Sequence, residues 1–369
     1  MKILFAGRYN YGNTFTGPEK VARRIYEACS RDSISFQTAF VNYFFDGNKY
    51  GIFKKLFGKE VLNENNNCSE FRLGLFRILL YAFKFKPDII HLINYERFAV
   101  VFFLYRLFRK VKIIYNVHGI AVYENSINPE ASGKLKFKDS ICEKIYFDKS
   151  DILIFLSGLS KKTAQRFYKF SDSKTVIIPN GIDREFHIAG KRRENIAENN
   201  LKIVFIGDIN KKEKGFSGLI SALNKTDFSI ELYAVSNALP DQMTSEEIIK
   251  NDKISFHVIS KMDTGKYAEF LSDKDIYISA SFYEQFSIAA VESMAAGLVP
   301  VVSADTGMLT FIKNGVNGFV YNNETELISV LTNLNSDRES VRGISEKAKL
   351  IYEDLNMENI FKKYKDLYL

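Results

Sequence analysis

Two glutamates, Glu284 and Glu292, are the side chains whose type and spacing most favour ligand chemistry in this sequence. Glu284 precedes a run of small, helix-favouring residues, Ser287–Ala296, and Glu292 lies within that run. If the whole span were helical, a rise of about 1.5 Å per residue would separate the two by roughly 12 Å along the axis. Two carboxylates at that separation can bind hydroxyls at the two ends of one long polar ligand. The alternative is an exposed loop glutamate and a solvated helix glutamate without a shared role.

The flanking residues predict how this pair is positioned. A β-type run, Asp275–Ser279, comes before it, Gly297 suits the end of the helix, and Val299–Val302 predicts another buried strand. The order strand, loop, helix, strand is that of a parallel βαβ unit. The free N–H groups and the dipole at the start of such a helix suit a diphosphate.

This stretch resembles the donor-site signature of the retaining glycosyltransferase family 4 (glycosyl transferases group 1), which has the GT-B fold. The resemblance rests on Ser281-x-x-Glu284-x-Phe286 followed by Ser287-Ile288-Ala-Ala-Val-Glu292-Ser-Met-Ala-Ala-Gly297-x-x-Pro300. It implies that Glu284 contacts the donor sugar, that the helix start takes the diphosphate, and that Glu292 holds the ribose.

This chain departs from the family pattern on both sides of the phenylalanine. The family usually has glycine there, whereas this sequence has Gln285 and Ser287, which we expect to narrow the sugar pocket or change the loop. The resemblance assigns the backbone of Phe286, Ser287 and Ile288 to the charge of the diphosphate.

Length and composition limit the class of protein. The chain has 369 residues, enough for two domains, with 46% hydrophobic and 26% charged residues, as in soluble globular proteins. We expect no cleaved leader and no bilayer-spanning run. The widely spaced Cys29, Cys68 and Cys142 suit a reducing cytoplasm, and the net charge of +7 favours an anionic partner.

The amino-terminal residues predict a strand, Lys2–Gly7, and a glycine-containing loop that leads into a helix at Thr16–Glu19. The loop lacks the G-x-G-x-x-G pattern of dinucleotide-binding Rossmann domains. It resembles the family's first loop, which approaches the donor diphosphate and the acceptor, and Gly17 is the candidate there. The alternative is that Gly17 only starts the helix.

A basic and aromatic segment, residues 49–112, is densest at Phe71–Lys86 and Phe98–Lys112. Basic amphipathic helices can lie on an anionic membrane, so we expect peripheral association there as one interpretation. The other is that these pieces are core-packing helices with solvated basic ends, and both can hold together.

His118 ends the apolar run Lys112–Val117, where ligands bind in open α/β sheets. It matches the family's histidine that faces the donor hexose, whereas His91 lies inside its strand and is predicted to be structural. Pro179-Asn180-Gly181-Ile182-Asp183 resembles the family's interdomain junction. We therefore expect a first domain at residues 1–185, a linker at 186–200, a donor domain at 201–350 and a returning helix at 351–369.

The donor domain begins with a predicted strand, Leu201–Gly207. The family has arginine next and Lys-Gly six residues later, both cations serving the diphosphate; Lys214-Gly215 fits, but Asp208 replaces the arginine. Met262 lies in the loop that wraps the nucleotide base in the family. Asp273-Lys-Asp275 is predicted to be a helix end and turn, not a metal site.

The resemblance implies an α/β, GT-B protein: two Rossmann-like parallel-sheet domains facing across a cleft, with a carboxyl-terminal helix that returns to the first. It implies transfer of a hexose-type sugar, with retention, from a UDP- or GDP-sugar to a glycan or lipid-linked acceptor in cell-surface polysaccharide synthesis. His118, Lys214 and Glu284 are the expected catalytic residues, and no cofactor or metal is expected.

The alternatives are a catalytically inactive GT-B partner protein that binds a nucleotide-sugar, a sugar-nucleotide epimerase, and a basic membrane or nucleic-acid module. Asp208 favours the inactive partner protein. The interdomain junction at residues 179–183 and the pair Glu284 and Glu292 argue against the epimerase. We expect a cytoplasmic enzyme at the inner membrane face that does not act on nucleic acid.

Overall fold

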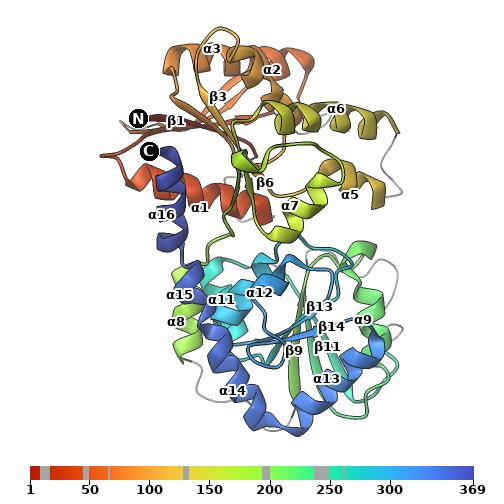
Figure 1. The fold of residues 1–369 in the computed structure, drawn as a ribbon. Coiled ribbons are helices and arrows are strands. Elements are labelled where there is room, and N and C mark those ends of the chain that lie inside the picture. The colour runs from red at the N-terminus through yellow and green to blue at the C-terminus, as the bar shows by residue number, and fades with distance from the viewer. Residues whose placement is uncertain are drawn as a thin grey trace. The chain divides into compact units, whose positions relative to one another are not determined.

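Two sheets organise the chain, one in each of two structural units, and their strands are parallel except at one edge of the first (Figure 1). The computed structural model describes residues 1–8, 17–44, 50–64, 67–127, 133–192, 200–236, 249–260 and 262–369. The first unit consists of Met1–Pro179 and Ile360–Leu369, and the second of Asn180–Asn359. The expected α/β class with two Rossmann-like parallel-sheet domains is confirmed.

The first sheet has the strand order β3-β4-β2-β1-β5-β6-β7-β8, and β3 pairs antiparallel with β4 at its edge. Its strands are β1 (Lys2–Ala6), β2 (Gln37–Tyr43), β3 (Lys59–Glu64), β4 (Cys68–Leu73), β5 (Ile89–Leu92), β6 (Lys112–Val117), β7 (Ile152–Phe155) and β8 (Thr175–Ile177). The helices of this unit are α1 (Gly17–Arg31), α2 (Ile52–Phe57), α3 (Leu75–Phe85), α4 (Val101–Tyr105), α5 (Ala121–Ile127), α6 (Gly133–Lys149) and α7 (Gly158–Gln165).

The two faces of the first sheet are covered by different helices. On one face, Tyr26 of α1 packs edge-on against Phe5 and Phe40, and helix α16 (Met357–Tyr368) covers β5 and β6. An ion pair of 2.7 Å between Lys365 and Asp32 ties α16 to the residues after α1. On the other face, α3, α4 and α6 bury their apolar side chains. Burial on both faces explains why the central strands are continuous apolar runs.

The second sheet is parallel throughout its described strands, in the order β11-β10-β9-β12-β13-β14. Its strands are β9 (Leu201–Ile206), β10 (Ile230–Val235), β11 (Ile254–Ile259), β12 (Ile276–Ser279), β13 (Val299–Ser303) and β14 (Phe319–Tyr321). The helices of this unit are α8 (Arg184–Arg192), α9 (Phe216–Leu223), α11 (Thr264–Ser272), α12 (Ile288–Ala295), α13 (Glu324–Ser336), α14 (Arg338–Lys349) and α15 (Ile351–Leu355). Strands β9 and β12 are neighbours, so the loops that follow them lie at the same edge.

Residues 186–192, which we expected in a linker, instead form most of α8. The reason is burial: Phe186 is fully buried with its ring 5.7 Å from that of Tyr267. Gly190 lies against α12 so closely that a Cβ there would be 2.3 Å from the carbonyl oxygen of Ala295. The rest of the expected linker, residues 193–199, lies outside the described residues.

The unit boundaries also differ from the expected ones. The second unit begins at Asn180, so the Pro-Asn-Gly-Ile-Asp segment lies at its start and not at the end of the first domain. The amide of Ile182 donates to the carbonyl of Leu355 at 2.8 Å, which joins this start to α15. Of the expected returning segment at 351–369, α15 and the start of α16 belong to the second unit, and the residues from Ile360 belong to the first. Throughout the described ranges, every helix is too short or too polar to cross a bilayer.

Candidate functional site

The loops after β9 and β12 meet at the carboxyl edge of the second sheet. The amide of Phe282 donates to the carbonyl of Glu213 at 3.0 Å, so the two loops are joined through their backbones. This edge is where ligands bind in open parallel sheets. The predicted cation Lys214 lies on one loop and the predicted carboxylate Glu284 on the other.

Lys214 and Glu284 lie side by side. The Nζ of Lys214 is 3.5 Å from Oε1 of Glu284, and the two side chains keep 30% and 20% of their surface exposed. A pair this accessible is worth at most about 1 kcal/mol, so either group can turn to a ligand at small cost. The arrangement offers a cation for a phosphate beside an acceptor for sugar hydroxyls.

The position after Lys214 requires a glycine, and Gly215 occupies it. Its φ is +68°, in the left-handed region that favours glycine, and it begins α9. A Cβ there would be 2.0 Å from the carbonyl oxygen of Ala280, in the loop after β12. Only glycine lets the two loops approach this closely, and that approach brings Lys214 to Glu284.

The backbone of Glu284 is held by a third loop, which follows β13. The amide of Glu284 donates to the carbonyl of Asp305 at 3.1 Å, and the amide of Gly307 donates to the carbonyl of Glu284 at 2.8 Å. The sequence analysis gave no role to the Asp-Thr-Gly motif at residues 305–307. Its place directly after the strand Val299–Ser303 is the signal that could have assigned one.

Ser287 caps helix α12. Its hydroxyl accepts the amide of Ala290 at 3.2 Å and lies 3.1 Å from the hydroxyl of Tyr277 on β12. The side chain is 2% exposed, so its role in the structure is to fix the start of the helix. The first-turn N–H groups beyond the cap remain suited to an anion.

The two residues before Ser287 anchor the loop. Gln285 and Phe286 are each 6% exposed, and the Phe286 ring meets that of Phe311 edge-on at 5.8 Å. Since the Phe286 ring is committed to this packing, its backbone is what the loop can present to a ligand.

Glu292 is buried in the helical layer, not at the loop. It is 2% exposed on α12, and burial together with the Glu292 carboxylate raises the pKa of Tyr267 on α11 well above its usual range. Met262, half buried, comes directly before Asp263, which caps α11 by accepting the amide of Lys266 at 3.0 Å. Glu292 therefore lies close to Tyr267 of α11, and Met262 lies just before the start of the same helix.

Asp208 turns its carboxylate toward its own loop. Its Oδ1 accepts the amide of Asn210 at 3.1 Å, and its carbonyl accepts the amide of Lys211 at 3.2 Å. This is an Asx turn at the start of the β9 loop. The acidic side chain at the position of the family's arginine thus has a local structural role.

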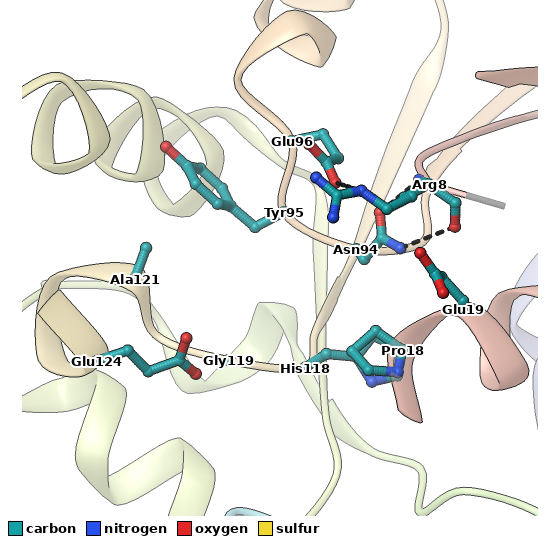
Figure 2. Close-up of a pocket in the computed structure, with 10 residues that line it drawn as sticks. All are labelled: Arg8, Pro18, Glu19, Asn94, Tyr95, Glu96, His118, Gly119, Ala121 and Glu124. Carbon is teal, nitrogen blue, oxygen red and sulfur yellow. Dashed lines mark hydrogen bonds and ion pairs between the residues drawn. The ribbon is translucent and has the colours of Figure 1, made fainter. Parts of the chain in front are cut away.

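A cavity of about 210 Å³ lies in the first unit, where β1, β5 and β6 end (Figure 2). Figure 2 shows Arg8 between Glu96 and Asn94, with His118 below them. The guanidinium of Arg8 is 3.2 Å from Glu96, while the Arg8 amide donates to Asn94 at 3.0 Å and the Asn94 amide donates to the Arg8 carbonyl at 3.2 Å. Burial raises the pKa of Glu96 to about 7, and Arg8 opposes that rise.

His118 lines this cavity and carries a buried hydrogen-bond acceptor. Burial lowers its pKa to about 4, so the ring is neutral at pH 7, and it hydrogen-bonds the backbone of Ile93. The amide of Ile93 already donates to Ala6, so its carbonyl accepts the proton of His118. The buried Nε2 of His118 has no partner among the described residues. Nε2 is therefore the unprotonated nitrogen, able to accept a ligand hydroxyl.

Sequence reasoning missed Arg8, Asn94 and Glu96. Arg8 lies two residues after the end of β1, and Asn94 and Glu96 lie two and four residues after the end of β5, its parallel neighbour; this position near the carboxyl ends of neighbouring strands was the available signal. Gly17 begins α1, whose next two residues, Pro18 and Glu19, line the cavity. Asn180 is 2% exposed, and it begins the second unit with Gly181.

The acidic motif Asp273-Lys-Asp275 has a structural role. Oδ2 of Asp275 accepts the amide of Lys202 at 2.9 Å and pairs with Arg338 at 2.8 Å, and Asp273 pairs with Lys202 at 3.4 Å. Within the described ranges, no three histidine, cysteine or acidic side chains lie together as metal ligands would.

Comparison with known proteins gives two family matches. Residues 188–351 match the model described as glycosyl transferases group 1, and residues 57–186 match that described as glycosyltransferase family 4. Among curated proteins, the N-acetyl-alpha-D-glucosaminyl L-malate synthase of Bacillus anthracis is 23% identical over 270 residues, covering 70% of this chain and 68% of its own. The alpha-monoglucosyldiacylglycerol synthase of Acholeplasma laidlawii is 23% identical over 54% of this chain. The matched part covers 53% of that relative's length.

Solved structures share the fold along the whole chain. The sucrose-phosphate synthase of Thermosynechococcus elongatus superposes with a TM-score of 0.79 at 17% identity, covering 100% of this chain and 98% of its own. Anabaena Alr3699/HepE in complex with UDP and glucose gives a TM-score of 0.73 at 17% identity, covering 100% and 99%. At such identities the likeness concerns the fold.

Proposed function

The chain belongs to the glycosyltransferases of family 4, or glycosyl transferases group 1, and has their GT-B fold, and from this premise we propose its reaction. It transfers a hexose-type sugar from a UDP- or GDP-sugar to a glycan or lipid-linked acceptor, with retention at the anomeric carbon. The observation that carries the proposal is the Lys214–Glu284 pair, 3.5 Å apart beside the start of α12.

The donor binds at the carboxyl edge of the second sheet. Lys214 and the first-turn amides of α12 neutralise the diphosphate, and Glu284 accepts hydroxyls of the sugar. Glu292 holds the ribose, and Met262 contacts the base. Because a cation and a helix start supply the positive charge, the reaction needs no metal.

The transfer step needs no enzyme nucleophile. The acceptor oxygen attacks the anomeric carbon on the face that the diphosphate leaves, so a bond to the acceptor forms as the bond to phosphate breaks. The electron pair leaves with the diphosphate, which receives the acceptor's proton. The enzyme contributes position and charge stabilisation, and the neutral Nε2 of His118 accepts a hydroxyl of the hexose.

The printed names of similar proteins support parts of this proposal. Alpha-monoglucosyldiacylglycerol synthase is named for a glycosylated lipid, N-acetyl-alpha-D-glucosaminyl L-malate synthase for a product that contains an amino sugar, and HepE was solved with UDP and glucose. We also propose that the enzyme acts in cell-surface polysaccharide synthesis, at the cytoplasmic face of a membrane that holds its acceptor.

The test combines binding with turnover. Calorimetry with UDP- and GDP-hexoses identifies the donor, and release of nucleoside diphosphate is then measured with soluble glycan and lipid-linked acceptors, with and without EDTA. We expect EDTA-resistant release and a product whose anomeric proton coupling matches that of the donor. Inverted product would overturn retention, and no release with any acceptor would overturn the enzyme assignment.

The second candidate is a nucleotide-sugar-binding partner protein without transferase activity. Asp208 in place of the family's arginine favours it, because the diphosphate then meets one cation fewer. Tight donor binding with no turnover in the same experiment would select this candidate.

A further inference from the structure

Three neighbouring elements of the first unit expose large apolar side chains: α2, α3 and the turn that follows α4. We call this surface the α2–α4 face, and its apolar members are Phe53, Phe57, Phe76, Leu80, Leu107 and Phe108. Phe53, Leu107 and Phe108 are 78%, 76% and 72% exposed, respectively. Single exposed apolar residues are ordinary, but a gathered set of this kind marks an interaction surface.

These side chains form a continuous band, not scattered points. The Phe57 ring stacks on Phe76 at 5.0 Å and lies 5.3 Å from Phe53, which joins α2 to α3. At the other end of α3, Phe83 lies 6.3 Å from Phe108, which joins it to the turn after α4. Figure 1 shows α2 and α3 side by side at the outside of their unit.

The layer beneath this band is a normal protein core. On α3, Ile78, Ala82 and Phe85 are buried against the sheet, while Phe76 and Leu80 point outward. The same helix thus packs on the core with one face and leaves a second apolar stripe uncovered. Since α1 and α16 lie on the opposite face of the sheet, neither covers that stripe.

The three segments that carry the band hold charges of one sign. Residues 50–59, 75–86 and 104–112 contain no aspartate or glutamate, and they carry the exposed cations Lys54, Arg77, Lys84, Arg109 and Lys110. Lysine and arginine stems can lie along an apolar surface while their charges reach outward. The complementary partner is therefore apolar just below an anionic layer.

We propose that the α2–α4 face docks on an anionic lipid bilayer, with the Phe and Leu side chains in the interface and the cations at the headgroups. A second copy of this chain would bring two cationic faces together, which charge disfavours. A nucleic acid would meet the cations but give no partner to Leu80 and Leu107. The biological purpose, bringing the enzyme to a lipid-linked acceptor, rests on the proposed function, whereas the docking itself stands on this surface.

The test is sedimentation of the full chain with vesicles of phosphatidylcholine, alone or with about a third phosphatidylglycerol. We expect the Phe108→Gln/Arg109→Gln double variant to partition to the anionic vesicles about tenfold more weakly than wild type. The matched control is Phe137→Gln/Lys138→Gln, an exposed aromatic–cation pair on α6 of the same unit, which should stay within about twofold of wild type. Thermal unfolding midpoints confirm that each variant is folded.

Three outcomes would overturn the docking proposal: equal partition of the two double variants, equal binding to neutral and anionic vesicles, or dimerisation of the wild type that Phe108→Gln/Arg109→Gln abolishes. Release of nucleoside diphosphate with a water-soluble acceptor is measured on the same preparations. Vesicle binding without release would contradict the proposed function alone, and release without vesicle binding would contradict the docking alone.

Discussion

The hydroxyl of Tyr368 lies 2.7 Å from Nδ1 of His91, so the last turn of α16 is hydrogen-bonded to the buried centre of β5. The other ring nitrogen, Nε2, lies 3.0 Å from Oδ1 of Asn116, whose Nδ2 donates to Tyr364 at 2.8 Å. Since Oδ1 is an acceptor, Nε2 carries the proton and the Tyr368 hydroxyl donates to Nδ1. Burial lowers the pKa of His91 to about 4, which keeps the ring neutral at pH 7.

Removing the hydroxyl in Tyr368→Phe leaves the buried Nδ1 of His91 without its donor. We expect the free energy of unfolding to fall by about 1–2 kcal/mol, measured by urea denaturation. Tyr352→Phe, which changes a half-buried tyrosine outside this cluster, serves as the control and should change stability by less than about 0.5 kcal/mol. Equal losses in the two variants would show that the His91 contact has no special role.

The His91→Gln variant tests the protonation state. Between pH 6.5 and 4, His91 is protonated in the unfolded chain but stays neutral in the folded protein. Its contribution therefore lowers the free energy of unfolding of the wild type as the pH falls. The stability advantage of wild type over His91→Gln should therefore shrink over that range, by at most about 1.4 kcal/mol per pH unit. A difference that stays constant with pH would mean that His91 does not titrate as inferred.

Lys214→Ala should weaken donor binding by about tenfold or more, because a charge-assisted contact to the diphosphate is lost. Lys212, exposed on the same short turn, provides the control, and Lys212→Ala should bind the donor like wild type. Calorimetry with the nucleotide-sugar measures both. The assignment of Lys214 fails if the two alanine variants bind the donor equally.

Substitutions of Glu284 and Glu292 should affect different kinetic and binding parameters. Glu284→Gln is expected mainly to lower kcat, since its contact to the reacting sugar matters most in the transition state. Glu292→Gln is expected mainly to raise the donor Kd, and the amide keeps the volume of this buried side chain. Steady-state kinetics with calorimetry resolves the two effects, and wild-type values for both variants would refute the site.

Asp208→Arg should keep or raise donor affinity, because it restores the cation that the family has at this position. The substitution loses the acceptor of the Asn210 amide, so Asp208→Asn, which retains an oxygen there, is the matched control. A clear loss of affinity in Asp208→Arg with normal binding in Asp208→Asn would show that the Asx turn matters more than the charge.

The helices and strands that could be predicted are those whose formation depends on residues close together in the sequence. The Ala-rich run after Glu284 forms α12 as expected, with Ser287 as its N-cap and Gly297, at φ +92°, directly after its C-cap Ala296. The run from Leu201 forms the central strand β9 because its apolar side chains are buried on both faces.

Long-range contacts determined what could not be predicted. The polar segment after Asp183 becomes helical because Phe186 reaches Tyr267, a residue far along the chain. The cavity residues Arg8 and Glu96 meet only after β1 and β5 pair, so their positions after the two strands suggest a common edge, but the local sequence does not identify them as partners.

The position of α16 also bears on how the protein is made. The helix that covers His91 and Asn116 begins at Met357, well after the rest of its unit ends at Pro179. While the second unit is being synthesised, His91 and Asn116 on one face of the first sheet lack the hydrogen-bond partners that α16 supplies. We infer that the amino-terminal unit starts folding first and is completed last, so a ribosome-bound chain that stops before Ile360 would hold an unfinished first unit.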